Sequence, residues 1–135
     1  MNKLLLLFFT PLLLNCVGPA DPDHGLVENL PAVINKNDVF SFVLRADGFN
    51  YDKSFDLSLA VPSNKLLLST LVITDFNSQD SSTIQIIGQN DTLVYSYLIK
   101  SNITVTSNHD YPSPKISKVR LNNFSGIIDW VVTAN

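Results

Sequence analysis

Two short stretches of the chain carry closely spaced Asp and Asn residues, whose side-chain oxygens are the ligands that calcium prefers. The first holds Asp47, Asn50 and Asp52, and the second holds Asp75, Asn77 and Asp80. Each is a candidate calcium loop. Neither follows the twelve-residue EF-hand pattern, which needs a glycine at its sixth position and a closing glutamate. Asp and Asn are also the residues that turns select for local hydrogen bonding, so ordinary turns are the competing interpretation.

The chain has few residues of the kinds that carry out catalysis. The chain has two histidines, His24 and His109, and no Gly-x-Ser-x-Gly nucleophile motif. A zinc site needs several His or Cys ligands, and residues 33–135 contain one histidine and no cysteine. Phosphate-binding loops are rich in glycine, and the five glycines of the chain form no such loop. We therefore expect no enzyme and no cofactor.

The first sixteen residues look like an export signal. A basic start at Lys3 precedes an apolar run, Leu4 to Leu14, and then Asn15 and Cys16. A span across a bilayer takes roughly twenty apolar residues, so this run of about eleven indicates the apolar region of a signal peptide, residues 1–15.

The end of this leader resembles a bacterial lipobox. Leu13-Leu14-Asn15-Cys16 departs from the usual pattern at Asn15, where Gly, Ala or Ser is expected. In this it is similar to the relaxed lipoboxes of spirochaetes, Leptospira in particular. The resemblance implies that Cys16 receives a diacylglyceryl group and becomes the mature N-terminus. It also implies a lipoprotein of the cell envelope, anchored in the outer or the inner membrane and facing the periplasm or the cell surface.

An ordinary secretory signal is the alternative. Cleavage would then follow Gly18-Pro19-Ala20 and leave a secreted protein, whose sequons at Asn90, Asn102 and Asn123 could carry glycans in a eukaryotic source. Cys16 is the single cysteine of the chain, so no disulfide can form within it. Stability must come from the core.

Beyond the leader, the composition divides the chain into a tether and one domain. Residues 16–32 are rich in prolines and acids, which is typical of a tether. Residues 33–135 form the domain. Without Lys3, eight Lys and Arg remain against twelve Asp and Glu, a net charge near −4. This acidic balance argues against a nucleic-acid partner.

The domain alternates apolar and polar residues with a period of two, which predicts strands. We expect seven or eight of them in an antiparallel β-sandwich, immunoglobulin-like or jelly-roll-like. Phe55 to Val61 shows the cleanest alternation. The predicted core between two sheets consists of Phe40, Phe42, Phe55, Leu57, Leu59, Ile84, Ile86, Tyr95, Val119, Leu121, Ile128, Trp130 and Val132.

Three connections, residues 47–53, 75–81 and 108–114, combine Asp, Asn and Ser with rings that could contact a protein or a glycan. The candidate binding residues are Phe49, Tyr51, Phe76, His109 and Tyr111. The sequence thus favours a lipid-anchored, non-catalytic binding module. In a competing interpretation these aromatic rings fold back and cap the core. A second hypothesis is a structural subunit of an envelope assembly that uses an exposed strand edge.

Overall fold

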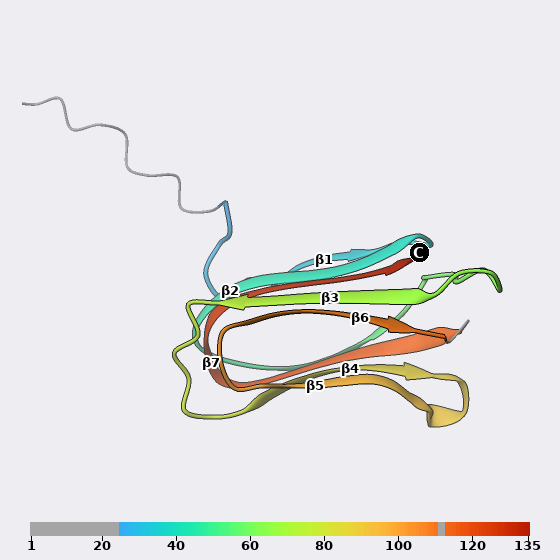
Figure 1. Cartoon of the computed structure of the whole chain (residues 1–135). Helices are drawn as coiled ribbons and strands as arrows, with labels where there is room; N and C mark the ends of the chain where they lie inside the picture. The colour runs from blue at the N-terminus through green and yellow to red at the C-terminus, as the bar shows by residue number, and fades with distance from the viewer. Residues whose placement is uncertain (1–24, 111–112) are drawn as a thin grey trace, which may run out of the picture.

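The computed structural model describes residues 25–110 and 113–135, which form an all-β domain of seven antiparallel strands (Figure 1). Cys16 and Tyr111 lie outside the described residues. The strands, with one short 3-10 helix between the fourth and the fifth, are β1 (Ala32–Asn35), β2 (Val39–Asp56), β3 (Leu67–Thr74), β4 (Ser82–Gly88), η2 (Gln89–Asp91), β5 (Leu93–Ile99), β6 (Ile103–His109) and β7 (Pro114–Ala134). The predicted class and a strand number of seven are confirmed.

The sheet is single and strongly curled, because two long strands run through both of its layers (Figure 1). The first half of β2 pairs with the second half of β7, and the second half of β2 pairs with the first half of β7. One layer has the order β1-β2-β7-β3-β6, and in the other β4 lies between β7 and β5. The expectation of two separate sheets is therefore corrected to one half-barrel sheet folded over its core.

The two long strands bend at the same level. The register between β2 and β7 shifts between Ala46 and Phe49 and again between Phe49 and Tyr51. Gly126, paired with Ala46, has φ +143°, and a Cβ there would lie 3.0 Å from the carbonyl oxygen of Thr74. Only glycine fits this close backbone approach. The glycines and bulges here bend the strands instead of ending them.

Trp130 lies at the centre of the core and is fully buried. Its ring meets Phe40 edge-on at 5.5 Å and stacks on Tyr95 at 6.2 Å. Its indole N–H donates a hydrogen bond to Ser69 Oγ at 2.9 Å. Of the thirteen predicted core residues, Phe55 and Leu57 are half-buried and the others are buried. Buried positions that were not predicted include Leu44, Leu67, Leu71, Ile73, Ile99 and Phe124.

Residues 55–61, the segment with the cleanest alternation, leave the sheet after Asp56. β2 ends at Asp56, and Leu57 N–H donates to the carbonyl of Lys115 at 2.7 Å. The next amide, Ser58 N–H, donates to Asn35 Oδ1 at 2.9 Å. Leu59 and Val61 are still buried. The prediction of a strand through Val61 was wrong because a loop can bury alternate side chains without pairing.

Among residues 25–110 and 113–135, no helix has the length and hydropathy needed to cross a bilayer.

Candidate binding groove

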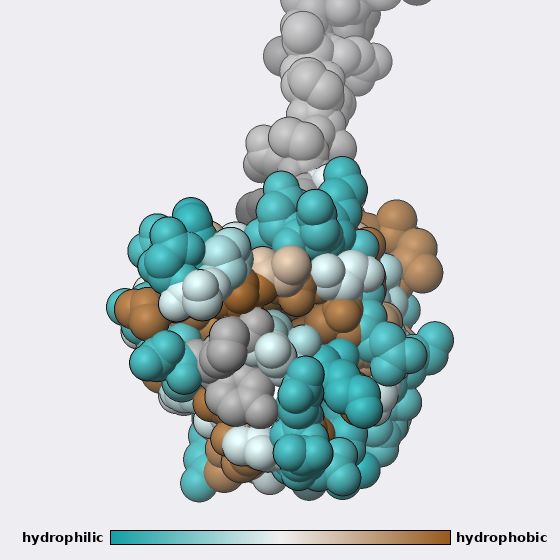
Figure 2. Space-filling model, turned by 90° about the vertical axis from the view of Figure 1, so that its right-hand side faces the viewer, coloured by the Kyte–Doolittle hydropathy of each residue, from teal (hydrophilic) through white to brown (hydrophobic). Residues whose placement is uncertain are grey.

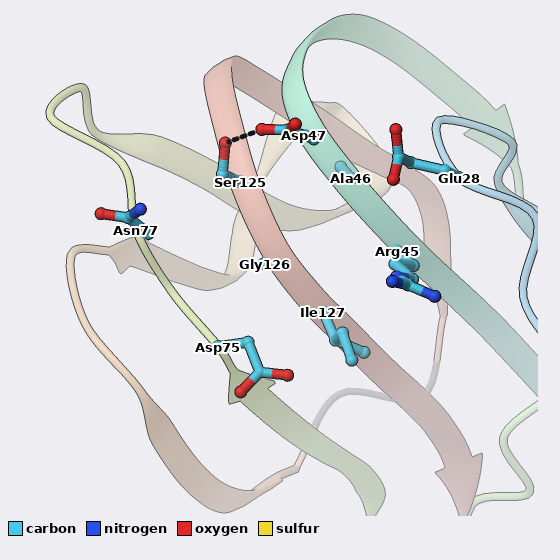
Figure 3. Close-up of a pocket in the computed structure, with 9 residues that line it drawn as sticks. All are labelled: Glu28, Arg45, Ala46, Asp47, Asp75, Asn77, Ser125, Gly126 and Ile127. Carbon is cyan, nitrogen blue, oxygen red and sulfur yellow. Dashed lines mark hydrogen bonds between the residues drawn. The ribbon is translucent and has the colours of Figure 1, made fainter. Parts of the chain in front are cut away.

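A groove of about 330 Å³ lies at the end of the molecule where β2 and β7 bend (Figure 3). We call it the tether-end groove, because Glu28, near the described end of the predicted tether, lines it. Residues of both candidate calcium stretches meet here, although the two stretches are far apart in sequence. The lining residues are Glu28, Arg45, Ala46, Asp47, Asp75, Asn77, Ser125, Gly126 and Ile127.

Ser125 ties the walls of the groove together. Its hydroxyl accepts a hydrogen bond from Gly48 N–H at 2.8 Å and donates to Asp47 Oδ1 at 3.2 Å (Figure 3). Its backbone N–H donates to Ser78 Oγ at 2.8 Å, and its carbonyl accepts from Asn77 N–H at 3.0 Å. The bend of β2 and the β3–β4 loop are thus both fastened to one residue of β7, which fixes the shape of the groove.

The described end of the predicted tether forms a third wall. Asn29 N–H donates to the carbonyl of Arg45 at 2.8 Å. Asn29 also exchanges two hydrogen bonds with the backbone of Asp47, at 3.0 and 3.3 Å. Its φ of +59° is one that Asn tolerates. These contacts hold Glu28 beside Arg45, to which it forms a parallel bridge.

Glu28, Arg45 and Ser125 are groove residues that sequence reasoning missed. Glu28 fell within the predicted tether, and neither Arg45 nor Ser125 was among the candidate site residues. Asn29 and Asp75 adopt positive φ values, which Asn and Asp tolerate better than most residues. The presence of Asn and Asp at these positions is a local sequence feature that fits the turns beside the groove.

The groove offers carboxylates from three segments, Glu28, Asp47 and Asp75, beside one guanidinium, Arg45. Such a set binds cations or hydrogen-bond donors. Within the part of the chain that the structure describes, no group of three or more His, Cys, Asp or Glu side chains is placed to hold a metal ion. The convergence of Asp47, Asp75 and Asn77 therefore gives no support to calcium.

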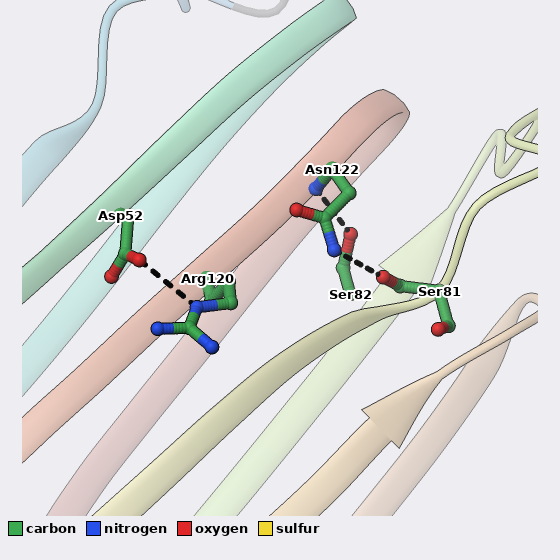
Figure 4. Close-up of polar contacts among 5 residues, drawn as sticks. All are labelled: Asp52, Ser81, Ser82, Arg120 and Asn122. Atoms are coloured by element: carbon green, nitrogen blue, oxygen red, sulfur yellow. Dashed lines mark hydrogen bonds and ion pairs between the residues drawn. The ribbon is translucent and has the colours of Figure 1, made fainter.

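The other three calcium candidates are engaged elsewhere. Asp52 pairs with Arg120 Nε at 2.9 Å on the surface of the second layer (Figure 4). Asn50 Oδ1 accepts from Asn123 N–H at 2.9 Å, across the bend of the two long strands. Asp80 lines a separate hollow with Lys100.

Figure 4 also shows a polar contact that joins β7 to the start of β4. Asn122 N–H donates to Ser82 Oγ at 3.1 Å, and its side-chain amide donates to the carbonyl of Ser81 at 2.9 Å. The neighbouring ion pair of Asp52 and Arg120 is exposed at both side chains, so it contributes little to stability. These contacts hold β2, β4 and β7 in position.

The candidate binding rings pack against the core. Phe49 stacks on Tyr51 at 5.7 Å, and Tyr51 in turn lies 5.7 Å from Phe42. Phe76 lies against Phe124 at 6.0 Å. Burial raises the pKa of Tyr51 above its ordinary value. The structure thus favours the interpretation in which these rings cap the core.

Two of the predicted loops are also placed differently from the expectation. Residues 47–53 belong to the continuous strand β2, so they are not a loop. His109 is the last residue of β6, at the end of the molecule away from the groove, and its ring meets Tyr95 edge-on at 5.4 Å. Figure 2 shows that end, where hydrophilic and hydrophobic side chains are interspersed. His109 and the groove therefore do not belong to one surface.

Comparison with protein-family models, with curated proteins and with solved structures finds no match for this chain. Function therefore has to be inferred from the groove and from the exposed surface.

Proposed function

We propose that the chain is an exported lipoprotein, anchored to a membrane of the cell envelope through Cys16, whose β domain binds a partner protein without catalysis. The binding site is the tether-end groove. The observation that carries this proposal is the convergence of three separate segments on one polar groove that their own hydrogen bonds keep open. A preformed groove loses little conformational entropy on binding.

The charges of the groove favour a cationic partner. The groove lining includes three carboxylates, of Glu28, Asp47 and Asp75, but only one guanidinium, and the whole chain carries a net charge of −3. Lysine or arginine side chains of another protein would complement this surface, and complementary charge speeds and orients association.

A glycan fits the groove less well. Sugar rings pack well on exposed aromatic faces, and the groove lining holds no aromatic residue. Trp130 is fully buried, and the half-buried Phe76 packs on Phe124. A protein is therefore the partner that we propose, and glycan binding is an outcome that the experiment can reveal.

For the finer fold we propose a sandwich of the immunoglobulin-like or jelly-roll-like kind. The two layers of the curled sheet enclose one core, as the layers of a sandwich do. The long strands β2 and β7 take the place of separate strands in the two sheets.

The test is affinity capture from detergent-solubilised envelopes with the full-length protein. Asp75→Asn removes one groove carboxylate and keeps a residue that tolerates φ +53°. Asp91→Asn is the matched control, since Asp91 has φ +56° and lies in η2, which follows Gly88, a residue paired with Pro114 at the end of β7 far from the groove.

We expect one basic protein to be captured by the wild type and by Asp91→Asn, and about tenfold less of it by Asp75→Asn. Equal capture by the wild type and both variants would exclude the groove as the site. Recovery of a glycan in place of a protein would replace the partner class.

A structural subunit of an envelope assembly is the second candidate function. The observation that favours it is the edge of β6, which among residues 25–110 and 113–135 pairs only with β3. Exposed strand edges are templates for pairing with another chain.

A further inference from the structure

The described sheet has four edges, formed by β1, the second half of β2, β5 and β6. Of these, β6 combines length with an unbroken register. β1 is an edge of four residues. The second half of β2, which pairs with β7 alone, carries register shifts and the charges of Asp52, Lys53 and Asp56. The β4–β5 ladder shifts register between Ile86 and Ile87. The β3–β6 ladder runs without a shift over seven pairs, from Leu67 with His109 to Ile73 with Ile103.

β6 also lacks the features that protect sheet edges. Proteins usually guard an edge with lysines, prolines, bulges or inward-pointing charges. The sequence of β6, Ile-Thr-Val-Thr-Ser-Asn-His, contains no Lys, Arg, Asp, Glu or Pro. Its β-branched residues favour extended pairing. The edge of β6 is therefore suited to pairing with another strand.

The side chains of β6 are only partly shielded from water. None of its seven residues is buried, whereas β2, β3, β4, β5 and β7 each contain buried residues. Ile103 and Val105 point toward the core but are only half-buried. A strand added at this edge would shield both side chains from water, which favours association.

We propose that β6 pairs antiparallel with β6 of a second copy of this chain, so that two curled sheets join edge to edge. A two-fold axis through the middle of the seven-residue strand places Thr106 opposite Thr106 of the second copy. It pairs Val105 with Ser107, Thr104 with Asn108 and Ile103 with His109. No residue of β6 lines the tether-end groove, so the proposal does not depend on what the groove binds.

Charge is the reason for choosing a second copy as the occupant. Two copies that each carry a net charge of −3 repel one another over most of their surfaces. The uncharged β6 edge is where that repulsion is small. In the proposed register the nearest acid, Asp110, faces Asn102 of the second copy and not another carboxylate.

The expected interface is small. Seven residues at about 3.4 Å each give an edge about 24 Å long. We expect a contact along one strand edge of this length to lie at the lower end of the sizes of specific interfaces, near about 1,000 Å² or less, and the dimer to dissociate in the micromolar range.

The test is sedimentation of the full-length protein in density-matched detergent. Thr106→Lys places two ammonium groups opposite each other at the axis, and Thr106→Glu places two carboxylates there. Thr70→Lys is the matched control, because Thr70 lies beside Thr106 on the same face, 3.2 Å between hydroxyl oxygens, but one strand further in. Thermal unfolding of each variant reports its folding.

We expect the wild type and Thr70→Lys to dimerise, and each Thr106 variant alone to dissociate about tenfold or more readily. An equimolar mixture of the Lys and Glu variants should dimerise again, which a folding defect would not allow. A wild type that stays monomeric at about 100 µM, or dimers that persist in Thr106→Lys, would overturn the proposal. Failure of the mixture to recover dimers would do the same.

Discussion

Trp130 donates its indole N–H to the hydroxyl of Ser69 at 2.9 Å inside a core where both residues are fully buried. The two residues lie on the neighbouring strands β7 and β3 of the first layer. Ser69 is therefore present in the core as a hydrogen-bond acceptor and not as a packing residue. Sequence periodicity places a serine at an inward position but cannot give this reason for it.

Ser69→Ala should leave the indole N–H of Trp130 buried without a partner. We expect the free energy of unfolding to fall by about 1–3 kcal/mol, measured by urea denaturation. The control is Ser54→Ala, which removes an exposed hydroxyl of β2 and should change stability by about 0.5 kcal/mol or less. Equal effects of the two variants would show that the buried hydrogen bond contributes nothing.

Leu71→Ala and Leu57→Ala remove the same atoms from different environments. Leu71 is fully buried, so its truncation should cost about 2–5 kcal/mol. Leu57 is half-buried in a loop after β2 and should cost about 1 kcal/mol. Sequence alternation alone would assign the larger value to Leu57. Chemical denaturation of both variants decides between the two accounts.

Gly126→Asn and Gly48→Asn test the bend of the two long strands. Asn tolerates the φ of +60° at Gly48, where the nearest contact of a Cβ is Asn123 Oδ1 at 3.4 Å. At Gly126 the φ is +143° and backbone atoms of the β3–β4 loop lie within 3.0–3.3 Å. We expect about 2 kcal/mol or more of destabilisation at Gly126, and about 1 kcal/mol or less at Gly48. The reverse order in thermal unfolding would rule out a role for this close approach.

Tyr95 should make stability fall at alkaline pH. Burial raises the pKa of its phenol above 10.0, an effect that Ser69 nearby reduces only in part, while Tyr97 adds to it. Above pH 10 the unfolded chain ionises this phenol first, so it binds fewer protons than the folded chain and unfolding is favoured as pH rises. The contribution is fully present below about pH 10 and is lost as pH rises toward the folded-state pKa.

Tyr95→Phe should therefore flatten the loss of stability above pH 10, as followed by urea unfolding between pH 8 and 11. At neutral pH the variant should cost little, because the Tyr95 hydroxyl has no hydrogen-bond partner of good geometry. An unchanged alkaline slope would contradict this assignment. Tyr51→Phe, at a less buried phenol with the same direction of pKa shift, gives a smaller reference effect.

The sequence predicted the strands better than their connections. Alternation around Phe42, Ile84 and Trp130 marks inward positions correctly, because side chains on a strand alternate between faces. The sequence predicts a connection over residues 47–53, around Gly48, where the structure has a bend within β2. A turn signal does not distinguish a reversal from a bend, and the bend exists only because β2 and β7 pair with each other across it. That pairing is non-local and has no local sequence signature.

The candidate groove was predicted only in part, for the same reason. Asp47 and Asp75 stand out as loop acids, but nothing local shows that they meet. Their meeting depends on Ser125, which holds both stretches from β7. The candidate rings were chosen for their loop positions, and their packing on core residues such as Phe42 and Phe124 is again a non-local fact.

The proposal that this domain acts at a membrane depends on Cys16, and intact-mass and N-terminal peptide mass spectrometry of the protein purified from its native membranes tests it most directly. The account predicts a mature chain that begins at Cys16, with the mass of a diacylglyceryl group on that residue, and a Cys16→Ala variant that leaves the membrane fraction or stays unprocessed. A mature chain that begins, unmodified, at Asp21 would contradict it.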